Sequence, residues 1–415
     1  MARRQGYIVH FKNRFRGAAI AHLDTGYFFS DRLDFNTRKL ARDAAVGNEW
    51  VIRAYDHIGV DAVNVSYHDL PQMANCFSSA EFKRHASTTP VVQRFVSANV
   101  RARSGRHQSP RPFLIKELVG ERLGARPLRL GIVGLTEKGN ASDPTFVIDD
   151  PLQAARRVIP QVRPRVDLVV VMAYMQPEAI EQLVRENPQI DIVIADLGRP
   201  QVYPPRTIGK TFIAYTYYQT KLLGELRLYR DGQTGKIRFS HRAVELDRVI
   251  PDDPSTEQLR VEARKEIAAM QELIVRQLLS ERRRDRSSTR DAVGPTYVGS
   301  QTCQPCHEAA HRVWARSGHA RAYATLQKVK RENDPQCVIC HVTGWGEPSG
   351  FVSLASTPLL KDVHCESCHG PGSEHVARPA RGYGHTVMPA GCVSCHTREN
   401  SPDFELVSYW ARIKH

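Results

Sequence analysis

Apolar and polar positions follow a regular pattern over the first 250 residues and lose it near the end of the chain. Short apolar runs of strand length alternate with amphipathic stretches of helix length. The runs are AAIAHLD (18–24), DAVNVSY (61–67), LRLGIVGL (128–135), VDLVVVMAY (166–174) and IDIVIADL (190–197), with helical patterns at 150–162 and 177–187. Strands that alternate with helices are typical of layered α/β domains. We therefore predict an α/β layered domain over residues 1–250.

A hairpin and one long helix follow this pattern. TKLLGELRLYR and KIRFSHRAVELD flank the turn DGQTG at 231–235, which predicts two antiparallel strands. Apolar residues at helical spacing then predict a helix from about Ser255 to Arg284, with Ser255 and Gln258 as a capping box. A polar segment ends this stretch, so we assign 251–296 to a helix and linker.

The composition changes in the final region, 297–415. Eight of the nine cysteines lie between 303 and 395, and ten of the 17 histidines lie from 307 onward. Periodicity is weak there, and Gly and Pro are frequent. Such a segment would struggle to build an apolar core of its own. We predict a mostly helical or irregular domain that is held together by something other than apolar packing.

The pattern Cys-x-x-Cys-His occurs four times in this region and includes all of its cysteines. Zinc ribbons also use Cys-x-x-Cys pairs, but zinc needs no histidine directly after each pair. A thioredoxin-like dithiol would occur once, inside a βαβ pattern. Attachment of c-type haem uses all three residues, because two thiols form thioethers with the vinyl groups and the histidine binds iron. We predict four c-type haems, with zinc sites and disulfides as alternatives.

The four motifs define the candidate site residues. The predicted haem-attachment residues are Cys303, Cys306, Cys337, Cys340, Cys365, Cys368, Cys392 and Cys395, and the predicted proximal iron ligands are His307, His341, His369 and His396. Six histidines remain as candidates for the opposite side of the iron: His311, His319, His364, His375, His385 and His415. For each of the six, the alternative is an exposed or hydrogen-bonding side chain. Histidine as sixth ligand suits low-potential electron transfer.

The region resembles the tetrahaem cytochromes c of ammonia-oxidising bacteria (the cytochrome c-five-five-four family), which accept electrons from hydroxylamine oxidoreductase. The resemblance covers about 297–410, roughly a quarter of the chain. Its matching stretches are YVGSQTCQPCHEAAHRVWARSGHARAYATL (297–326), CVICHVTGWG (337–346), VHCESCHGPGSEH (363–375) and CVSCHT (392–397).

The resemblance implies three distal ligands. His319 would bind the haem of the fourth motif, His375 that of the first motif and His385 that of the third. A different spare histidine is the alternative in each case. The haem on His341 would then be five-coordinate, which leaves a position for a small ligand.

The N-terminal domain resembles the calcineurin-like metallophosphoesterases, close to the 5′-nucleotidases. The resemblance rests on HLDTGYFF (22–29), VNVSYHDL (63–70), VVVMAYM (169–175) and DIVIADLG (191–198). In that family the strand ends carry two metal ions, which activate a water and clamp a phosphate. The resemblance implies a metallophosphoesterase-like sandwich whose first strand is missing, since the family's Asp-x-His motif has no counterpart.

Most metal ligands of that family are replaced in this sequence. Tyrosines stand at three of the positions, Tyr27, Tyr67 and Tyr174, and among the family's ligands only His68 and Asp69 remain. Two side chains alone cannot hold a dinuclear site. We therefore expect no dinuclear metal site and no phosphoesterase activity, and a scaffold or docking role for this domain.

Charge and targeting signals limit location and partners. No apolar run approaches the roughly 18 residues that a membrane span needs, and no apolar signal-peptide core follows the basic start. Haem attachment takes place outside the cytoplasm, so we expect a periplasmic or otherwise extracytoplasmic protein whose signal peptide is missing from this chain. The net charge of +14 comes without a nucleic-acid motif, so we expect no nucleic acid as partner.

These patterns together predict a multihaem c-type cytochrome that transfers electrons between redox proteins, with a metal-less scaffold attached. The expected partners are a hydroxylamine-oxidoreductase-like donor or a membrane quinone or cytochrome partner. The alternatives are a haem enzyme that acts on a small nitrogen species at the second haem, an active phosphoesterase, and a subunit of a larger redox complex or filament.

Overall fold

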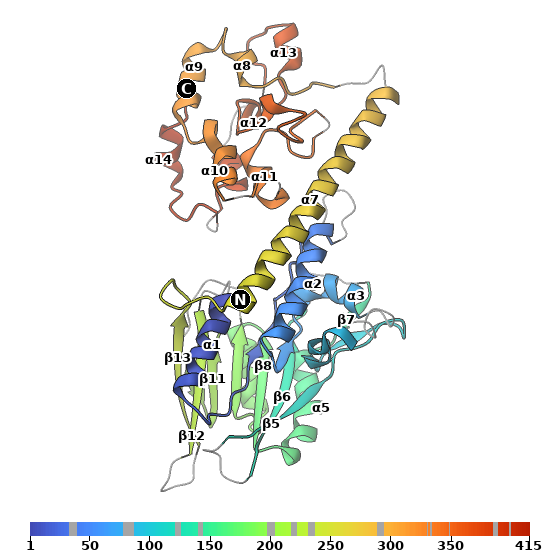
Figure 1. Cartoon of the computed structure of the whole chain (residues 1–415), viewed down its shortest axis with the longest axis vertical. Helices are drawn as coiled ribbons and strands as arrows, with labels where there is room; N and C mark the ends of the chain where they lie inside the picture. Colours follow the sequence, from blue (N-terminus) through green and yellow to red (C-terminus); the bar gives the residue numbers. More distant parts are fainter. Residues whose placement is uncertain are drawn as a thin grey trace. The chain divides into compact units, whose positions relative to one another are not determined.

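The computed structural model describes residues 1–32, 40–77, 87–120, 126–139, 144–196, 204–216, 222–230, 237–288, 294–329, 331–332, 334–347, 349–384, 389–397 and 400–415. The chain forms two compact units, Met1–Ile267 and Ala268–His415, and each is considered by itself (Figure 1).

The N-terminal unit alternates strands and helices, as its apolar pattern predicts. With η for 3-10 helices, its elements are α1 (Ala2–Arg14), β1 (Leu23–Asp24), α2 (Arg42–His57), β2 (Ala62–Asn64), η1 (Tyr67–Asp69), α3 (Leu70–Cys76), η2 (Pro90–Arg94), β3 (Phe95–Val96), β4 (Val100–Ala102), β5 (Phe113–Leu118), β6 (Leu128–Thr136), β7 (Phe146–Ile148), α5 (Pro151–Val162), η4 (Arg163–Arg165), β8 (Leu168–Tyr174), α6 (Pro177–Glu186), β9 (Ile192–Asp196), β10 (Arg206–Ile208), β11 (Thr211–Tyr215), β12 (Leu222–Arg230), β13 (Ile237–Glu245) and the start of α7 (Pro254–Ser288).

A six-stranded sheet forms the centre of this unit, in the order β10-β11-β9-β8-β6-β5. Strands β11, β9, β8 and β6 are parallel, and the edge strands β10 and β5 are antiparallel to their neighbours. Every residue of β8 is buried, as expected for a central parallel strand that is covered on both faces. Alternate residues of β8 therefore enter two different apolar clusters, with Val171 on one face and Met172 on the other.

Four layers result from this alternation. Helices α5 and α6 pack on the Val171 face of the six-stranded sheet. The parallel three-stranded sheet β1-β2-β3 and the hairpin β12–β13 pack on the Met172 face. Helices α2 and α3 then cover the outer face of the three-stranded sheet. The predicted α/β layered fold is confirmed, and it places the carboxyl ends of β1, β2, β8 and β9 close together.

Some predicted boundaries were wrong. The run at 18–24 forms a strand only at Leu23–Asp24, and that at 61–67 forms a strand only at Ala62–Asn64 because the chain then turns into η1. The long helix begins with Pro254, and its cap is Asp253 instead of Ser255, since the Asp253 carboxylate accepts from the Thr256 N–H at 2.8 Å. The turn predicted at 231–235 lies outside the described residues.

Short helices make up the C-terminal unit after α7, and its described residues contain no strand. They are α8 (Ser300–Cys303), α9 (Glu308–Arg316), η6 (His319–Arg321), α10 (Ala322–Lys328), α11 (Pro335–His341), η7 (Pro358–Leu360), α12 (Glu366–His369), α13 (Ser373–Ala377), η8 (Pro389–Ser394) and α14 (Leu406–Ala411). One apolar cluster is found in the described part of this unit, with six buried residues: Tyr323, Leu326, Val338, Val342, Phe351 and Leu360.

Apolar side chains remain exposed in the C-terminal unit close to the Cys-x-x-Cys-His motifs. Ile339 and Val393, which lie between the two cysteines of the second and fourth motifs, are 56% and 54% exposed. A single exposed apolar residue is ordinary, but a small core combined with exposed apolar spacers agrees with a domain that packs around a cofactor.

Candidate functional site

Each Cys-x-x-Cys-His motif lies in or next to a single helical turn. In three motifs the backbone N–H of the histidine donates to the carbonyl of the first cysteine, at 3.0 Å for His307, 2.9 Å for His369 and 2.9 Å for His396. In the second motif, His341 is the last residue of α11. Residues three and four positions apart lie on the same side of such a turn. The spacing therefore directs two thiols and one imidazole of each motif to a common side, as covalent haem attachment requires.

Three motif histidines face a second histidine from a distant part of the unit. The ring centres are 6.0 Å apart for His307 and His375, and 6.0 Å apart for His319 and His396. Two imidazoles that bind one metal ion from opposite sides have ring centres about 6 Å apart, because each metal–nitrogen bond is about 2 Å long. These side chains thus fit a six-coordinate iron. The structure brings together the two pairs that the family resemblance implied, and their role as haem ligands stays a prediction.

The third pair joins His369 to His415, with ring centres 5.9 Å apart. The resemblance implied His385 for this position, and His385 lies outside the described residues. The sequence alone assigns no ligand role to His415. His415 lies in no recognisable motif, so its being a histidine was the one feature that indicated a possible iron ligand.

His341 differs from the other three motif histidines. Its Nδ1 lies 2.8 Å from the carbonyl oxygen of Ala322 and 3.2 Å from the hydroxyl of Thr325. A metal-bound histidine commonly donates its other N–H to such a carbonyl, which fixes the ring. Within the part of the chain that the structure describes, no second imidazole faces His341.

Aromatic rings orient the paired imidazoles. Tyr383 stacks on His375 with ring centres 4.8 Å apart, and Phe404 stacks on His396 at 4.7 Å. Burial lowers the pKa of His319 and of His396, so both imidazoles are favoured in the neutral form, which can bind a metal.

His364, directly before the third motif, has a structural role. It is buried, and its Nδ1 accepts from the Ser300 N–H at 3.1 Å, while a hydrogen bond to the backbone of Lys361 engages the ring as well. Burial lowers the pKa of His364 to about 4. Backbone groups of Ser300 and Lys361 therefore hold the ring in place.

The thiols show which motifs are neighbours. Cys303 hydrogen-bonds to Cys365, and this contact raises the pKa of Cys303 and lowers that of Cys365. Cys340 and Cys395 form the same kind of pair. The first motif therefore lies beside the third, and the second beside the fourth.

Aromatic side chains fill the strand-end site of the N-terminal unit. Tyr27, His68 and Tyr174 come from loops or ends of different strands, yet the rings of Tyr27 and His68 stack at 3.9 Å and both lie edge-on to Tyr174, at 6.3 and 5.9 Å. Burial raises the pKa of the Tyr174 hydroxyl. These three side chains therefore form a tyrosine–histidine cluster at the strand ends.

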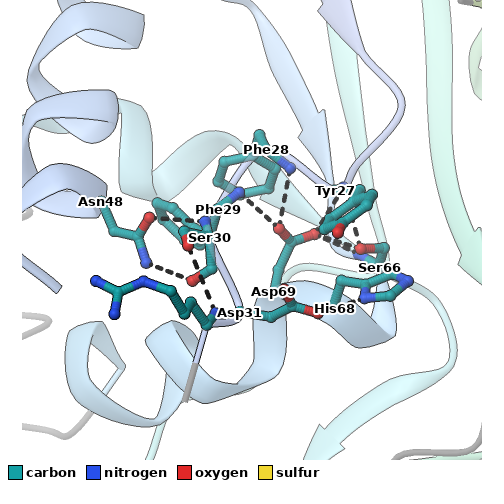
Figure 2. Close-up of polar contacts among 10 residues, drawn as sticks. Tyr27, Phe28, Phe29, Ser30, Asp31, Asn48, Ser66, His68 and Asp69 are labelled. Atoms are coloured by element: carbon teal, nitrogen blue, oxygen red, sulfur yellow. Dashed lines mark hydrogen bonds and ion pairs between the residues drawn. The ribbon is translucent and has the colours of Figure 1, made fainter. Parts of the chain in front are cut away.

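Asp69 is fully engaged with the backbone (Figure 2). One carboxylate oxygen accepts from the N–H groups of Phe28 and Phe29, each at 3.0 Å, and the other accepts from the N–H of Tyr27 and from the N–H and hydroxyl of Ser66, at 3.0, 2.9 and 2.6 Å. Burial raises the pKa of Asp69 to about 6, against the effect of these hydrogen bonds.

The second surviving position is engaged too. His68 Nδ1 lies 2.6 Å from a carboxylate oxygen of Asp31 (Figure 2). The described residues contain no group of three or more histidine, cysteine or acidic side chains that could hold a metal ion. The arrangement is suited to fixing the loop at Tyr27, whose φ of 57° is the left-handed conformation that side chains rarely adopt.

No helix among the described residues has the length and apolarity needed to cross a membrane.

Comparisons with known proteins give different relatives for the two parts of the chain. The N-terminal part is similar to solved structures that include the sulfate thiohydrolase SoxB of Thermus thermophilus in complex with glycerol (16% identity, TM-score 0.49, 63% of this chain and 46% of that one). Others are the calcineurin-like phosphoesterase YfkN of Bacillus subtilis (15%, 0.48, 64% and 89%) and a 5′-nucleotidase precursor of Thermus thermophilus (18%, 0.48, 65% and 53%).

Residues 302–370 match the family described as cytochrome c554 and c-prime. The cytochrome c-554 of Nitrosomonas europaea is 35% identical over 96 residues, which are 20% of this chain and 41% of that protein. The matched stretch thus spans about two fifths of the relative's length. The C-terminal part of the chain is similar to the cytochrome c554 family, as its four motifs indicated, and solved structures similar to the N-terminal part include calcineurin-like phosphoesterases and 5′-nucleotidases.

Proposed function

We propose that this protein is an extracytoplasmic c-type cytochrome that transfers electrons between redox partners through four covalently attached haems. The observation that carries the proposal is the pairing of imidazoles, about 6 Å apart, at three of the four attachment motifs. The similarity to the cytochrome c554 family supports the same cofactor. Haems of this kind, when bound, take up and release single electrons at iron.

Each haem site has its own residues in this proposal. Two cysteines of each motif form the thioether links, and the motif histidine is the proximal ligand. On the opposite side, His375 serves the first motif and His319 the fourth, and His415 takes the place expected for His385 at the third. Bis-histidine ligation favours electron transfer over binding of substrates.

The contacts between motifs support transfer within the unit. The sulfur of Cys303 in the first motif lies beside that of Cys365 in the third, and the sulfur of Cys340 in the second lies beside that of Cys395 in the fourth. The thiol of Cys368, in the third motif, also interacts with Cys392 and Cys395 of the fourth. The four motifs therefore lie near one another, which supports electron transfer between neighbouring haems.

A second function is favoured at the second motif. His341 has no imidazole opposite it among the described residues, and its Nδ1 is held by Ala322 and Thr325. An iron held there would keep one coordination position open. A small nitrogen species such as nitric oxide or hydroxylamine is the ligand class that fits this position.

The N-terminal unit serves as a metal-less scaffold or docking module in this proposal. Its strand-end site is filled by Tyr27, His68 and Tyr174, and both oxygens of Asp69 are already occupied. A donor of the hydroxylamine-oxidoreductase type and a membrane quinone or cytochrome partner are the classes of redox partner that we propose.

The deciding experiment is export of the full chain, with an added signal peptide, in cells that attach c-type haem. The haem-to-protein ratio, the mass and the spin state are then measured. We expect four haems, three of them low-spin and one high-spin that changes its spectrum with nitric oxide. Stoichiometric zinc without haem would contradict the proposal, and four low-spin haems would contradict the open position alone.

A further inference from the structure

We propose that Glu366 is a buried negative charge that fixes the first haem motif against the third and lowers the reduction potentials of the two haems attached there. Glu366 is one of the two residues between the cysteines of CESCH. The inference rests on the proposed function, because it concerns haems at these two motifs.

The carboxylate is buried and bound by backbone groups alone. Glu366 is 4% exposed. One oxygen accepts from the N–H groups of Val298 and Gly372 at 2.9 and 2.8 Å, and the other from those of Gly299 and Val298 at 2.7 and 3.1 Å. No described lysine or arginine forms an ion pair with it. Both oxygens act only as acceptors, which is the hydrogen-bonding pattern of an ionised carboxylate.

These hydrogen bonds join segments that are far apart in sequence. Val298 and Gly299 directly precede α8, which ends at Cys303 of the first motif, and Gly372 follows the third motif. Gly299 has a φ of 85°, and a side chain there would come within 2.9 Å of the carbonyl oxygen of Leu359. The backbone at this point is therefore shaped to present its N–H groups to Glu366.

Neutral hydrogen bonds complete the same connection. The Thr296 N–H donates to the Ser373 hydroxyl at 2.7 Å, and the Ser373 N–H donates to the Thr296 carbonyl at 3.1 Å. The Ser300 N–H donates to His364. Among these contacts only Glu366 carries a charge. Substitutions can therefore separate the effect of the charge from the effect of the hydrogen bonds that join the two motifs.

The charge reaches both motifs. The carboxylate lies beside both motifs, because Glu366 directly follows Cys365 in the chain and accepts from the N–H groups of Val298 and Gly299, just before the helix that ends at Cys303. Solvent screens a buried charge weakly. A carboxylate near iron stabilises the ferric state, which carries one more positive charge than the ferrous state, so the reduction potential falls. The residues at the same position in the other three motifs are neutral: Gln304, Val338 and Val393.

The test is a redox titration of the haem-loaded full chain, comparing the parent with E366Q. Glutamine keeps the size of the side chain and removes its charge. We expect the two lowest midpoint potentials to rise and the other two to stay. E374Q, which removes an exposed charge in the same region, and S373A, which removes a neutral contact of the connection, should leave all four in place.

Hydrogen exchange gives a readout that does not depend on iron. The amides of Val298, Gly299 and Gly372 should exchange slowly in the parent and faster in E366Q, while S373A should affect Thr296 first. Unchanged potentials in an E366Q protein with four haems would overturn the charge role. Equal shifts of the midpoint potentials in S373A would also overturn it, because they would show that the placement of the two motifs, and not the charge, sets the potentials.

If E366Q does not retain its haems, the inference is tested on the parent protein. Paramagnetic NMR then assigns the four potentials to motifs, and potentials at the first and third motifs above those at the second and fourth would overturn the inference. Failure of the proposed function has a different signature, since the parent itself would then contain no haem at these motifs.

Discussion

The two units of this chain reach stability by different means. In the N-terminal unit, α5 and α6, a six-stranded sheet, a second sheet with a hairpin, and α2 with α3 bury apolar side chains at every interface between layers. The described part of the C-terminal unit has one apolar cluster of six buried residues, and apolar spacers of its motifs stay exposed. Apolar packing between layers stabilises the N-terminal unit, whereas under the proposed function covalent haem attachment would supply much of the stability of the C-terminal unit.

Removal of haem should have the largest effect, and it should act on the C-terminal unit alone. When the chain is produced in the cytoplasm, without haem attachment, we expect residues 297–415 to lose protection against hydrogen exchange while residues 1–250 keep theirs. The reason is the small apolar core of the C-terminal unit. Exchange is measured by mass spectrometry on the full chain, and the exported haem-loaded protein is the control. Equal protection in both forms would show that the C-terminal unit folds without a cofactor.

A cavity in the N-terminal core should destabilise the N-terminal unit and leave the haem domain unaffected. Met172, on β8, is completely buried. M172A should destabilise the N-terminal unit by about 2–5 kcal/mol, the usual range for such a truncation, and leave the haem spectrum unchanged. V249A, at a residue that is 86% exposed, is the matched control and should cost less than about 0.5 kcal/mol. Urea unfolding followed by hydrogen exchange of residues 1–250 measures both variants.

Replacement of Asp69 should destabilise the N-terminal unit through lost hydrogen bonds, with its apolar packing unchanged. D69N keeps one acceptor oxygen and replaces the other by an amide donor, so the N–H groups bound to one of the two carboxylate oxygens lose their acceptor, at a cost of roughly 1–3 kcal/mol for each donor left unpaired. D31N is the control, since it removes only the contact of His68. Similar stabilities of D69N and the parent would mean that the hydrogen bonds do not fix this loop.

The same carboxylate predicts a dependence on pH. A pKa that rises from 3.8 in the unfolded chain to about 6 in the folded one makes a contribution of about 3 kcal/mol, at about 1.4 kcal/mol per unit. The folded state binds more protons in this window, so the contribution is complete below pH 3.8 and is lost as the pH rises through about 6. Urea midpoints between pH 4 and 7 measure it, and D69N should lack this slope.

The smallest expected effect on stability comes from His415. H415A should convert the haem of the third motif from low-spin to high-spin, because His415 faces His369. Electron paramagnetic resonance then shows two high-spin haems instead of one, with the fold of both units retained. H385A is the matched comparison, and a spin change in H385A instead of H415A would restore the ligand that the family resemblance implied.

Sequence reasoning reached different depths in the two units. The layers of the N-terminal unit follow from apolar runs such as 166–174, because a strand buried on both faces has a nearly continuous apolar sequence. The attachment motifs are equally local, since all their residues lie within one turn. In contrast, the pairing of His369 with His415 depends on the tertiary fold, because the two residues are far apart in sequence and no motif spacing relates them.

Polar contacts over long sequence distances were missed for the same reason. Asp69 appeared in the sequence as a leftover metal ligand, yet in the structure it binds the backbone at 27–29. His364 appeared as a spare ligand, yet Ser300 and Lys361 occupy its ring. A sequence shows that such a side chain can accept or donate a hydrogen bond, but the fold decides which group it meets.

The three imidazole pairs also bear on the unfolded chain. Each pair joins positions roughly 45 to 80 residues apart. An iron bound by both members of a pair would close a loop of that length, much as a disulfide does, and would remove conformational entropy from the denatured ensemble. The three loops overlap in sequence, so opening one would still leave the others to constrain most of the unit. Loss of a single iron–imidazole bond would then open only one loop, and the remaining two loops would still limit unfolding of the domain.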